Sequence, residues 1–150
     1  YKRQDSTHSP MFHQVEVLFV NENANMGDLK GTLIEFCKQF FNVQNLKVRF
    51  RPSYFPFTEP SAEMDIAYEI VNNKIQLGQG DRWLEILGCG MVNPIVLENC
   101  NVDTNIYQGF AFGVGLDRIT MLKYGLTDIR SFFSGNLNWI ASNGFTIGDF

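Results

Sequence analysis

Phe12, Gln14 and Glu16 are three side chains at alternate positions that could bind an amine and a flat ring. Alternate residues of a β-strand point to one face, so the ring, the amide and the carboxylate would line one surface. Aromatic rings stack on flat groups, and amide and carboxylate oxygens accept hydrogen bonds from an ammonium group. Taken alone, the segment is explained better by an ordinary edge strand with a solvated face. The binding interpretation therefore depends on the segments that follow.

Residues 49–63 combine aromatic residues, prolines and carboxylates, a mixture that simple core packing does not need. Proline fixes φ and lacks a backbone donor, so we expect no regular central strand or helix here. Rigid turns would instead hold Phe55 and Phe57 on either side of Pro56. Two fixed rings near Glu59 would form a slot for a flat apolar group beside a charged one. Composition favours this slot and a packed aromatic loop about equally.

Two glycine-containing segments carry charged side chains that could contact a bound ligand. Within residues 83–90, Glu85 interrupts an apolar strand, and a buried carboxylate needs a partner, such as an arginine. Residues 109–118 hold glycines that we expect to open a helix, with Arg118 in its first turn. A fixed guanidinium suits phosphate recognition, and an ion pair with Asp117 is the structural alternative. The glycines lack the βαβ context of a dinucleotide-binding loop.

Hydrophobic periodicity predicts an α+β domain built on an antiparallel sheet with helices on one side. Alternating or apolar runs predict strands at 12–20, 46–51, 63–70, 74–77 and 83–87. Helical spacing and capping signals predict helices at 28–41 and 115–124 and helical turns at 94–99 and 128–139. This order does not alternate as a parallel α/β fold requires. We expect residues 68–82 to form a surface hairpin insertion and residues 140–150 to form a loose tail.

The bulk composition predicts one domain of a reducing compartment. The 150 residues are 45% hydrophobic, enough for one well-packed core. The net charge of −4 argues against a domain that holds nucleic acid through phosphates alone. Cys37, Cys89 and Cys100 show no paired spacing and are expected to be free thiols. Neither a run of roughly 20 apolar residues nor a signal-peptide pattern is present, so we expect a cytoplasmic protein without membrane contact.

Four segments carry the most specific patterns of the chain. They are Thr-His-Ser-Pro-Met-Phe-His-Gln (7–14), Arg-Phe-Arg-Pro-Ser-Tyr-Phe-Pro-Phe-Thr-Glu-Pro-Ser-Ala-Glu (49–63), Trp-Leu-Glu-Ile-Leu-Gly-Cys-Gly-Met-Val (83–92) and Gly-Phe-Ala-Phe-Gly-Val-Gly-Leu-Asp-Arg (109–118). In this order they closely resemble the catalytic domain of bacterial-type phenylalanyl-tRNA synthetase α subunits, which are class II aminoacyl-tRNA synthetases. The resemblance covers roughly residues 5–139. It implies a partial catalytic domain, truncated at its N-terminal side.

The resemblance implies a class II antiparallel sheet flanked by helices and a reaction in two steps. Phenylalanine and ATP give phenylalanyl-adenylate and pyrophosphate, and the phenylalanyl group then passes to the terminal adenosine of its tRNA. Positioning of the substrates and charge stabilisation by arginines and Mg²⁺ would supply most of the catalysis. The resemblance also implies a β-subunit partner, in an assembly of two α and two β subunits, and tRNA contacts mainly outside this chain.

Several positions match nucleotide-binding residues of the family. His8 matches the loop histidine near the ATP phosphates, and Phe12 matches the ring that stacks on adenine. Arg118 matches the motif 3 arginine, a catalytic residue that binds the γ-phosphate. Arg3 is the nearest candidate for the catalytic motif 2 arginine at the α-phosphate. Glu85 is a weaker candidate for a position near ATP and the metal.

Other positions match the phenylalanine pocket of the family. Gln14 and Glu16 match the pair that holds the substrate ammonium group. Phe55 and Phe57 match the two rings that contact the phenylalanine side chain edge to face. Thr58 matches a residue that lines the same pocket.

Two further positions match the ends of that pocket. Ala111 matches the small residue where the size of the substrate ring is checked. Glu59 matches a Mg²⁺ ligand shared with the partner subunit. The resemblance thus implies a phenylalanine side-chain pocket whose depth Ala111 sets and whose metal Glu59 helps to hold.

Departures from the family pattern leave a second function open. Val17 follows Glu16 where the family has glycine, and Asn93 stands where it has histidine. Near the start, Lys2 competes with Arg3 for the motif 2 position. A non-catalytic synthetase-like module that binds an aromatic amino acid or a nucleotide is therefore the alternative. Retention of the pocket residues and of the motif 3 arginine favours the enzyme.

Overall fold

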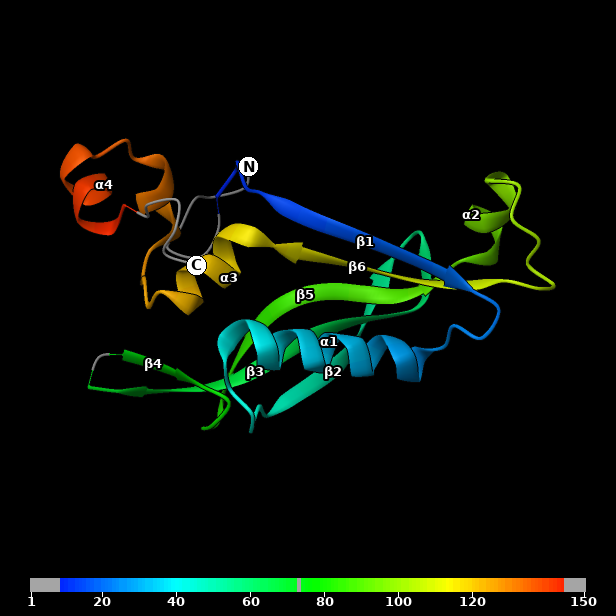
Figure 1. Ribbon diagram of the computed structural model, residues 1–150, viewed down its shortest axis with the longest axis horizontal. Coiled ribbons are helices and arrows are strands. Elements are labelled where there is room, and N and C mark those ends of the chain that lie inside the picture. The colour runs from blue at the N-terminus through cyan, green and yellow to red at the C-terminus, as the bar shows by residue number, and fades with distance from the viewer. Residues whose placement is uncertain (1–8, 73, 145–150) are drawn as a thin grey trace.

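One antiparallel sheet organises the part of the chain that the computed structural model describes, residues 9–72 and 74–144. Its strands lie in the order β1 (Gln14–Asn21), β6 (Gln108–Gly115), β5 (Arg82–Val92), β3 (Thr58–Val71) and β2 (Val48–Phe55) (Figure 1). The short β4 (Lys74–Leu77) pairs with the end of β3. All of these pairings are antiparallel, which confirms the α+β fold expected from the sequence.

Helix α1 (Met26–Phe41) covers one face of the sheet and closes the core. Its N-cap is Asn25, whose side chain accepts hydrogen bonds from the backbone N–H groups of the first turn. Leu29, Leu33 and Cys37 recur every fourth residue and are fully buried. They pack with apolar residues of the sheet, namely Ala62, Met64, Ile66, Leu87, Cys89, Phe110 and Val114. The helix expected at 28–41 is therefore confirmed, and it starts two residues earlier.

The remaining helices are short and follow the sheet strands. They are α2 (Pro94–Asn99), α3 (Leu116–Lys123), the 3₁₀ turn η1 (Ile129–Phe133) and α4 (Leu137–Asn143). Each lies within or beside a segment for which helical structure was predicted. Gly125 follows the end of α3 with a positive φ of 68°, as a helix-terminating glycine should. Helix α4 extends to Asn143, and residues 145–150 of the expected tail lie outside the described part.

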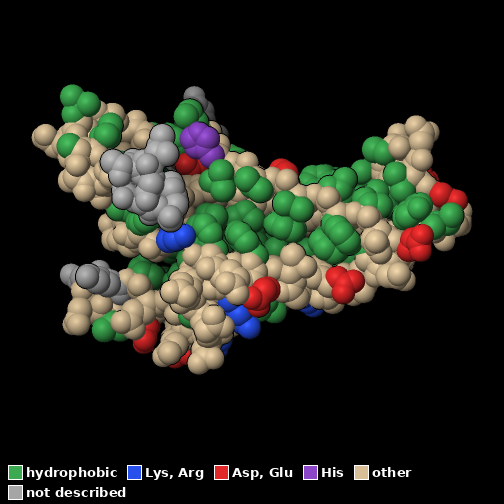
Figure 2. Space-filling model, viewed as in Figure 1, with side chains coloured by type: hydrophobic (Ala, Val, Ile, Leu, Met, Phe, Trp, Pro, Cys, Tyr) green, Lys and Arg blue, Asp and Glu red, His purple; other side chains and the backbone are tan. Residues whose placement is uncertain are grey.

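Strand β1 forms one edge of the sheet and carries exposed apolar side chains. Val15 and Leu18 are exposed, and so is Phe19, although its ring stacks on Phe110 with 4.9 Å between centroids. Figure 2 shows hydrophobic side chains gathered in a band over this side of the molecule, from β1 toward α2. Large exposed apolar surfaces of this kind are typical of interaction sites.

The proline-rich segment forms a β-hairpin. The prediction that it contains no regular central strand was wrong for β3, which lies between β2 and β5, whereas β2 is an edge strand. β2 and β3 pair from Val48–Ile66 to Phe55–Thr58 and leave Pro56 and Phe57 as a two-residue turn. Pro52 is tolerated because β2 is an edge strand, where a missing N–H costs no ladder bond on the solvent side. Pro60 lies where the pairing of β3 with β5 is interrupted, between Thr58 and Ser61.

The glycine-rich segment before Arg118 is a strand that the sequence did not predict, and the helix expected at 115–124 follows it as α3. β6 pairs with β1 on one side and with β5 on the other. Phe110, Phe112 and Val114 pack toward the core on one face. The intervening small residues, including Gly113, occupy the other face. Strand β5 likewise continues through Gly88 to Val92 instead of ending at the glycines.

A one-residue bulge in β5 redirects Glu85. Met64 pairs with Leu87 and Asp65 pairs with Glu85, so Ile86 is the extra residue. Without the bulge, Glu85 would share a face with Leu87 and Cys89, which lie against the core. With it, Glu85 joins the opposite face. The side chain is about half exposed, so the expectation of a buried carboxylate was wrong.

A buried carboxylate ties β2 to β3. Asp65, whose side chain is 2% exposed, accepts hydrogen bonds from Arg49 Nε at 2.7 Å and from Arg51 Nε and Nη2 at 2.6 and 2.9 Å. The hydrogen bonds from Arg51 hold the pKa of Asp65 below its usual value, against the effect of burial and with help from Arg49. Arg49 also lies over the Trp83 ring, 4.3 Å from its centroid. The two arginines therefore compensate the buried charge.

Replacing this carboxylate should destabilise the fold in a pH-dependent way. Asp65→Ala should lower the free energy of unfolding by about 1–3 kcal/mol at pH 7, because three hydrogen bonds to arginines are lost. Since the folded-state pKa is lowered, the contribution is complete above the unfolded-state pKa of about 4 and disappears as pH falls through the folded value. Urea unfolding of both proteins from pH 7 downward, followed by tryptophan fluorescence, measures the difference in the free energy of unfolding.

The control is Glu22, an exposed carboxylate outside the group formed by Asp65, Arg49 and Arg51. Glu22→Ala should change the free energy of unfolding by less than about 0.5 kcal/mol. Two results would contradict the stabilising role of Asp65. The two substitutions could change the free energy of unfolding equally at pH 7, or the effect of Asp65→Ala could grow as the pH falls.

Candidate active site

A cleft of about 650 Å³ lies on the face of the sheet opposite α1. It is bounded by β1, β5, β6, the β2–β3 hairpin and the start of α3. Nine of the residues singled out from the sequence line it: Phe12, Gln14, Glu16, Phe55, Phe57, Thr58, Glu85, Ala111 and Arg118. Segments separated by up to a hundred residues thus meet at one concave surface. His8 and Arg3 lie outside the described residues, so their predicted positions stay predictions.

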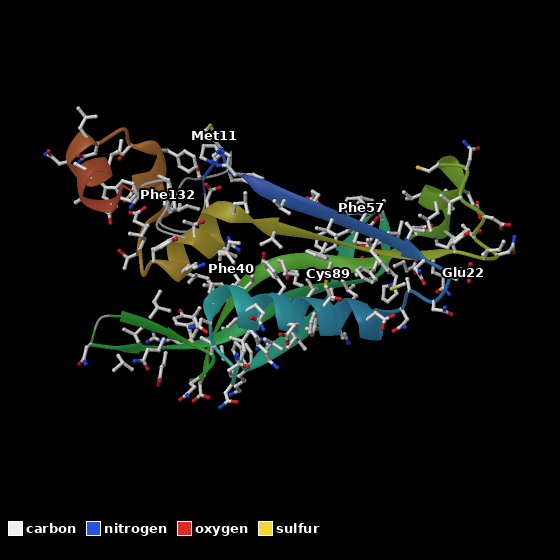
Figure 3. The ribbon with its side chains drawn as sticks, in the orientation of Figure 1. Met11, Glu22, Phe40, Phe57, Cys89 and Phe132 are labelled. Carbon is white, nitrogen blue, oxygen red and sulfur yellow. The ribbon has the colours of Figure 1, made fainter. Side chains whose placement is uncertain are left out.

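The two rings of the hairpin form one wall of the cleft. Phe55 and Phe57 lie 6.1 Å apart between centroids and 15° from parallel. The Phe55 N–H donates to Ser61 Oγ at 3.3 Å, and the Ser61 hydroxyl donates to the Thr58 carbonyl at 2.7 Å. These bonds fix the turn, and Figure 3 shows Phe57 on the hairpin that they close. The two rings predicted to be held beside Pro56 are therefore fixed on one wall of the cleft, which is built from strands, and their use as a slot for a flat group stays a prediction.

Glycines form the floor of the cleft and let side chains lie directly on the backbone. A Cβ placed on Gly88 would come within 2.6 Å of Phe55 Cζ. One placed on Gly113 would come within 2.5 Å of Gln14 Nε2 and 2.6 Å of Glu16 Oε1. Real Cβ atoms do not approach other atoms this closely. The Phe55 ring and the Gln14–Glu16 pair could therefore not occupy these positions if Gly88 and Gly113 were any residue other than glycine.

Gln14 and Glu16 lie side by side, as their alternation predicted. The Gln14 amide Nε2 donates to Glu16 Oε1, which leaves the amide oxygen and the second carboxylate oxygen as acceptors. Both residues are exposed to the cleft. An ammonium group needs several acceptors, at least one of them charged, and this pair provides them.

Arg118 and Glu85 form the polar end of the cleft. Arg118 Nη1 donates to the Glu85 backbone carbonyl at 3.1 Å and lies 3.4 Å from Glu85 Oε1. The Arg118 side chain is 20% exposed and that of Glu85 is 48% exposed. Asp117, the alternative partner considered for Arg118, is bonded instead to His13. A guanidinium held by a backbone carbonyl is positioned to bind an anion in the cleft.

The carboxylates divide between two cavities. Glu85 lies in the cleft, whereas Glu59 lines a separate cavity of about 250 Å³ with Pro60, Thr104 and Gln108. Among the described residues, no three His, Cys, Asp or Glu side chains gather in a way that could hold a metal ion. Mg²⁺ bound with a nucleotide takes only one or two protein carboxylates, so Glu85 fits such a role. Glu59 does not face the cleft in this structure.

Several residues that line the cleft were not predicted as site residues from the sequence. Ser9, Glu63, Gly113, Asp117 and Ile129 also line the cleft. Glu63 could have been found from its alternation with Asp65 on β3, which puts both carboxylates on one face. No local pattern marks Asp117 or Ile129, because their neighbours in the cleft come from distant segments.

The cysteines match the prediction of free thiols. Cys37 and Cys89 are buried, Cys100 is exposed, and none is disulfide-bonded. Burial raises the pKa of Cys37 to about 12 and that of Cys89 to about 11. No helix among the described residues is long and apolar enough to cross a membrane.

Comparison with known proteins identifies the family. The profile of the "tRNA synthetases class II core domain (F)" matches residues 1–143. The chain belongs to this family. It is 57% identical over 141 residues to the phenylalanine–tRNA ligase alpha subunit of Afipia carboxidovorans and 59% identical to that of Methylobacterium radiotolerans. Each alignment covers 94% of this chain and 39% of the relative. The chain thus spans about two-fifths of the length of these relatives.

A solved structure supports the fold of this class II core. The crystal structure of pyrrolysyl-tRNA synthetase from Desulfitobacterium hafniense matches with a TM-score of 0.51 at 13% identity. The match covers 90% of this chain and 42% of that protein. The antiparallel sheet with flanking helices is therefore the class II arrangement, as the resemblance implied.

The three cysteines should differ sharply in reactivity. Cys100 should react with a maleimide in the folded protein, and Cys37 and Cys89 should be protected, because only exposed thiolates react rapidly. Mass spectrometry of the three peptides, before and after unfolding in urea, measures the labelling. Cys100→Ser should remove the fast label and leave the other two unchanged. Rapid labelling of Cys37 in the folded state would contradict the packing of α1.

Proposed function

We propose that this chain is the catalytic core of a phenylalanine–tRNA ligase α subunit. It would activate phenylalanine with ATP to phenylalanyl-adenylate and transfer the phenylalanyl group to its tRNA. The observation that carries the proposal is the meeting of an ammonium-acceptor pair, an aromatic slot and a fixed arginine in one cleft. The names of the relatives agree with it.

Each part of the cleft has a distinct task in this reaction. Gln14 and Glu16 accept hydrogen bonds from the substrate ammonium group, and Phe55 and Phe57 contact its ring. The substrate carboxylate then attacks the α-phosphate of ATP in line with the departing pyrophosphate. Arg118 binds the γ-phosphate and compensates the charge that shifts to the leaving group. By resemblance, Phe12 stacks on the adenine, His8 lies near the phosphates, and Arg3 contacts the α-phosphate.

The metal would act at the polar end of the cleft. When bound there, Mg²⁺ would neutralise part of the charge of the phosphates. Glu85 is exposed beside Arg118 and is the carboxylate of this chain best placed to hold it. Glu59, the Mg²⁺ ligand expected by resemblance, lines the neighbouring cavity and would meet a metal there or at a subunit boundary.

The assembly is proposed to include a β subunit, in two copies of each chain, and to work in the cytoplasm. The exposed apolar band over β1 and α2 offers a surface for such packing. With a net charge of −4, this domain lacks the basic surface that grips tRNA by its phosphates. Most tRNA contacts would then belong to other parts of the assembly.

Two of the departures from the family pattern, Val17 and Asn93, do not themselves line the cleft, which favours the enzyme over a non-catalytic module. Val17 pairs with Phe112 on β6 and is half-buried, and it does not line the cleft. Asn93 caps α2 by accepting a hydrogen bond from the Ile95 N–H at 3.1 Å. Val17 is thus a strand residue beside Glu16, and Asn93, whose backbone N–H donates to the Phe57 carbonyl at 3.0 Å, supports the hairpin that carries the pocket rings.

Phenylalanine-dependent exchange of pyrophosphate into ATP tests the function. The full-length α subunit with its β subunit should exchange in the presence of phenylalanine. Arg118→Ala should lower exchange by about 10²-fold or more and leave phenylalanine affinity nearly unchanged, because the arginine acts on the phosphates. Arg82→Ala, an exposed arginine outside the cleft, is the matched control.

Two outcomes would count against this assignment. Binding of phenylalanine or ATP by the wild-type assembly without exchange would favour the non-catalytic module. Equal losses of exchange and phenylalanine affinity in Arg118→Ala would make that arginine structural.

Ala111 should set the depth of the phenylalanine pocket. Ala111→Gly removes a methyl group from the cleft and should admit para-substituted phenylalanines, with a gain of about 1–3 kcal/mol for a substituent that fills the space. Exchange rates with phenylalanine and para-chlorophenylalanine measure the change in selectivity. Unchanged selectivity would show that Ala111 does not contact the substrate ring.

A further inference from the structure

His13 is joined to the first turn of α3 by three hydrogen bonds. Its backbone N–H donates to Asp117 Oδ2 at 2.5 Å, and its imidazole Nδ1 donates to Asp117 Oδ1 at 3.0 Å. The Leu116 N–H donates to the His13 carbonyl at 2.9 Å. Because a carboxylate only accepts hydrogen bonds, the proton lies on Nδ1 of the imidazole. Both oxygens of one carboxylate thus hold a single residue.

The two partners are adjacent to residues that line the cleft. His13 lies between Phe12 and Gln14, and Asp117 immediately precedes Arg118. The ladder between β1 and β6 begins at Gln14, and His13 directly precedes it. The Phe133 ring of η1 lies 6.1 Å from the imidazole and 9° from parallel with it. These hydrogen bonds therefore connect the approach to β1 with α3, and the His13 side chain, which is 62% exposed, stacks beside a third element.

The hydrogen bonds between Asp117 and His13 also bear on which partner Arg118 has. The Asp117 carboxylate is buried and uses both oxygens on His13, whereas Arg118 bonds to Glu85 in the cleft. A carboxylate in the first turn of a helix is also favoured by the helix dipole. Asp117 therefore holds His13 without drawing the adjacent guanidinium out of the cleft.

We propose that His13 and Asp117 form a positioning pair that sets the separation between Phe12 and Arg118, and so between the two ends of the nucleotide site. The proposal rests on the proposed function, in which Phe12 stacks on adenine and Arg118 binds the γ-phosphate. Neither His13 nor Asp117 needs to touch ATP for this role. Loss of the pair should weaken the binding of ATP more than that of phenylalanine, because Gln14, Glu16 and the hairpin rings are held by sheet pairing.

Three variants of His13 separate positioning from general stability. His13→Ala removes the side-chain bond, and His13→Gln carries its amide one methylene too far from the backbone to replace Nδ1. His13→Asn places an amide nitrogen near the position of Nδ1 and should restore the bond. The dissociation constants of MgATP and of phenylalanine are measured by calorimetry on the full-length α subunit with its β subunit.

The dissociation constant of MgATP should rise about 10-fold in His13→Ala and His13→Gln and stay within about 2-fold of wild type in His13→Asn. That of phenylalanine should change less than about 2-fold in all three. The proposal is overturned if both constants rise equally, if asparagine restores no more than glutamine, or if the wild-type assembly does not bind MgATP.

A second measurement is independent of ligand binding and of ligase activity. Asp117→Ala should speed hydrogen–deuterium exchange of the His13 amide, which loses its acceptor, and leave the amides of β3 unchanged. Unchanged hydrogen–deuterium exchange of the His13 amide would show that Asp117 does not hold His13, and would overturn the proposal. A wild-type assembly that binds MgATP but exchanges no pyrophosphate would refute the proposed function while the positioning pair still stands.

Discussion

The cleft exists because one face of β5 and β6 is almost bare of side chains. Gly88 and Gly113 lie there, and a methyl group at either position would overlap Phe55 or the Gln14–Glu16 pair. On the opposite face the same strands carry Leu87, Cys89 and other residues that pack with α1. The two faces of the sheet therefore differ sharply. One face packs in a dense apolar core, and the other leaves the backbone of these strands open to the side chains of the cleft. Rings and acceptors can approach the backbone only because this asymmetry is kept along both strands.

Three devices bring the remaining side chains to this surface. The β2–β3 hairpin turns at Pro56 and holds the two rings, with Ser61 bonded across the turn. The bulge at Ile86 rotates Glu85 from the core face to the cleft face. The bond between His13 and Asp117 ties the approach to β1 to α3. Each device acts on backbone position, so the cleft is arranged before any ligand enters it.

The prolines and glycines show why the sequence misled in places. The prolines led to the expectation of no regular central strand in residues 49–63. Pro52, however, lies on an edge strand, and Pro60 lies at an interruption of the pairing between β3 and β5. Both positions tolerate proline because of the order of the strands in the sheet. The glycines do lead into the helix expected at 115–124, but the strand before it, β6, was not predicted. Strand β6 is held by partners on both sides, which outweighs the low intrinsic strand preference of glycine. The bulge at Ile86 likewise has no local signature, since it appears only when β5 is aligned with β3.

The sequence by itself determined the core of α1, the alternation of β3, the α+β class and, through four segment patterns, the resemblance to a class II synthetase. These properties depend on residue spacing within one segment, or on segment patterns that need no coordinates. Only the tertiary structure decided that Glu85 faces the cleft, that Glu59 lines another cavity, and that Asp117 bonds to His13 and not to Arg118. The reason is that side-chain direction and pairing are set by contacts between strands and helices far apart in the chain.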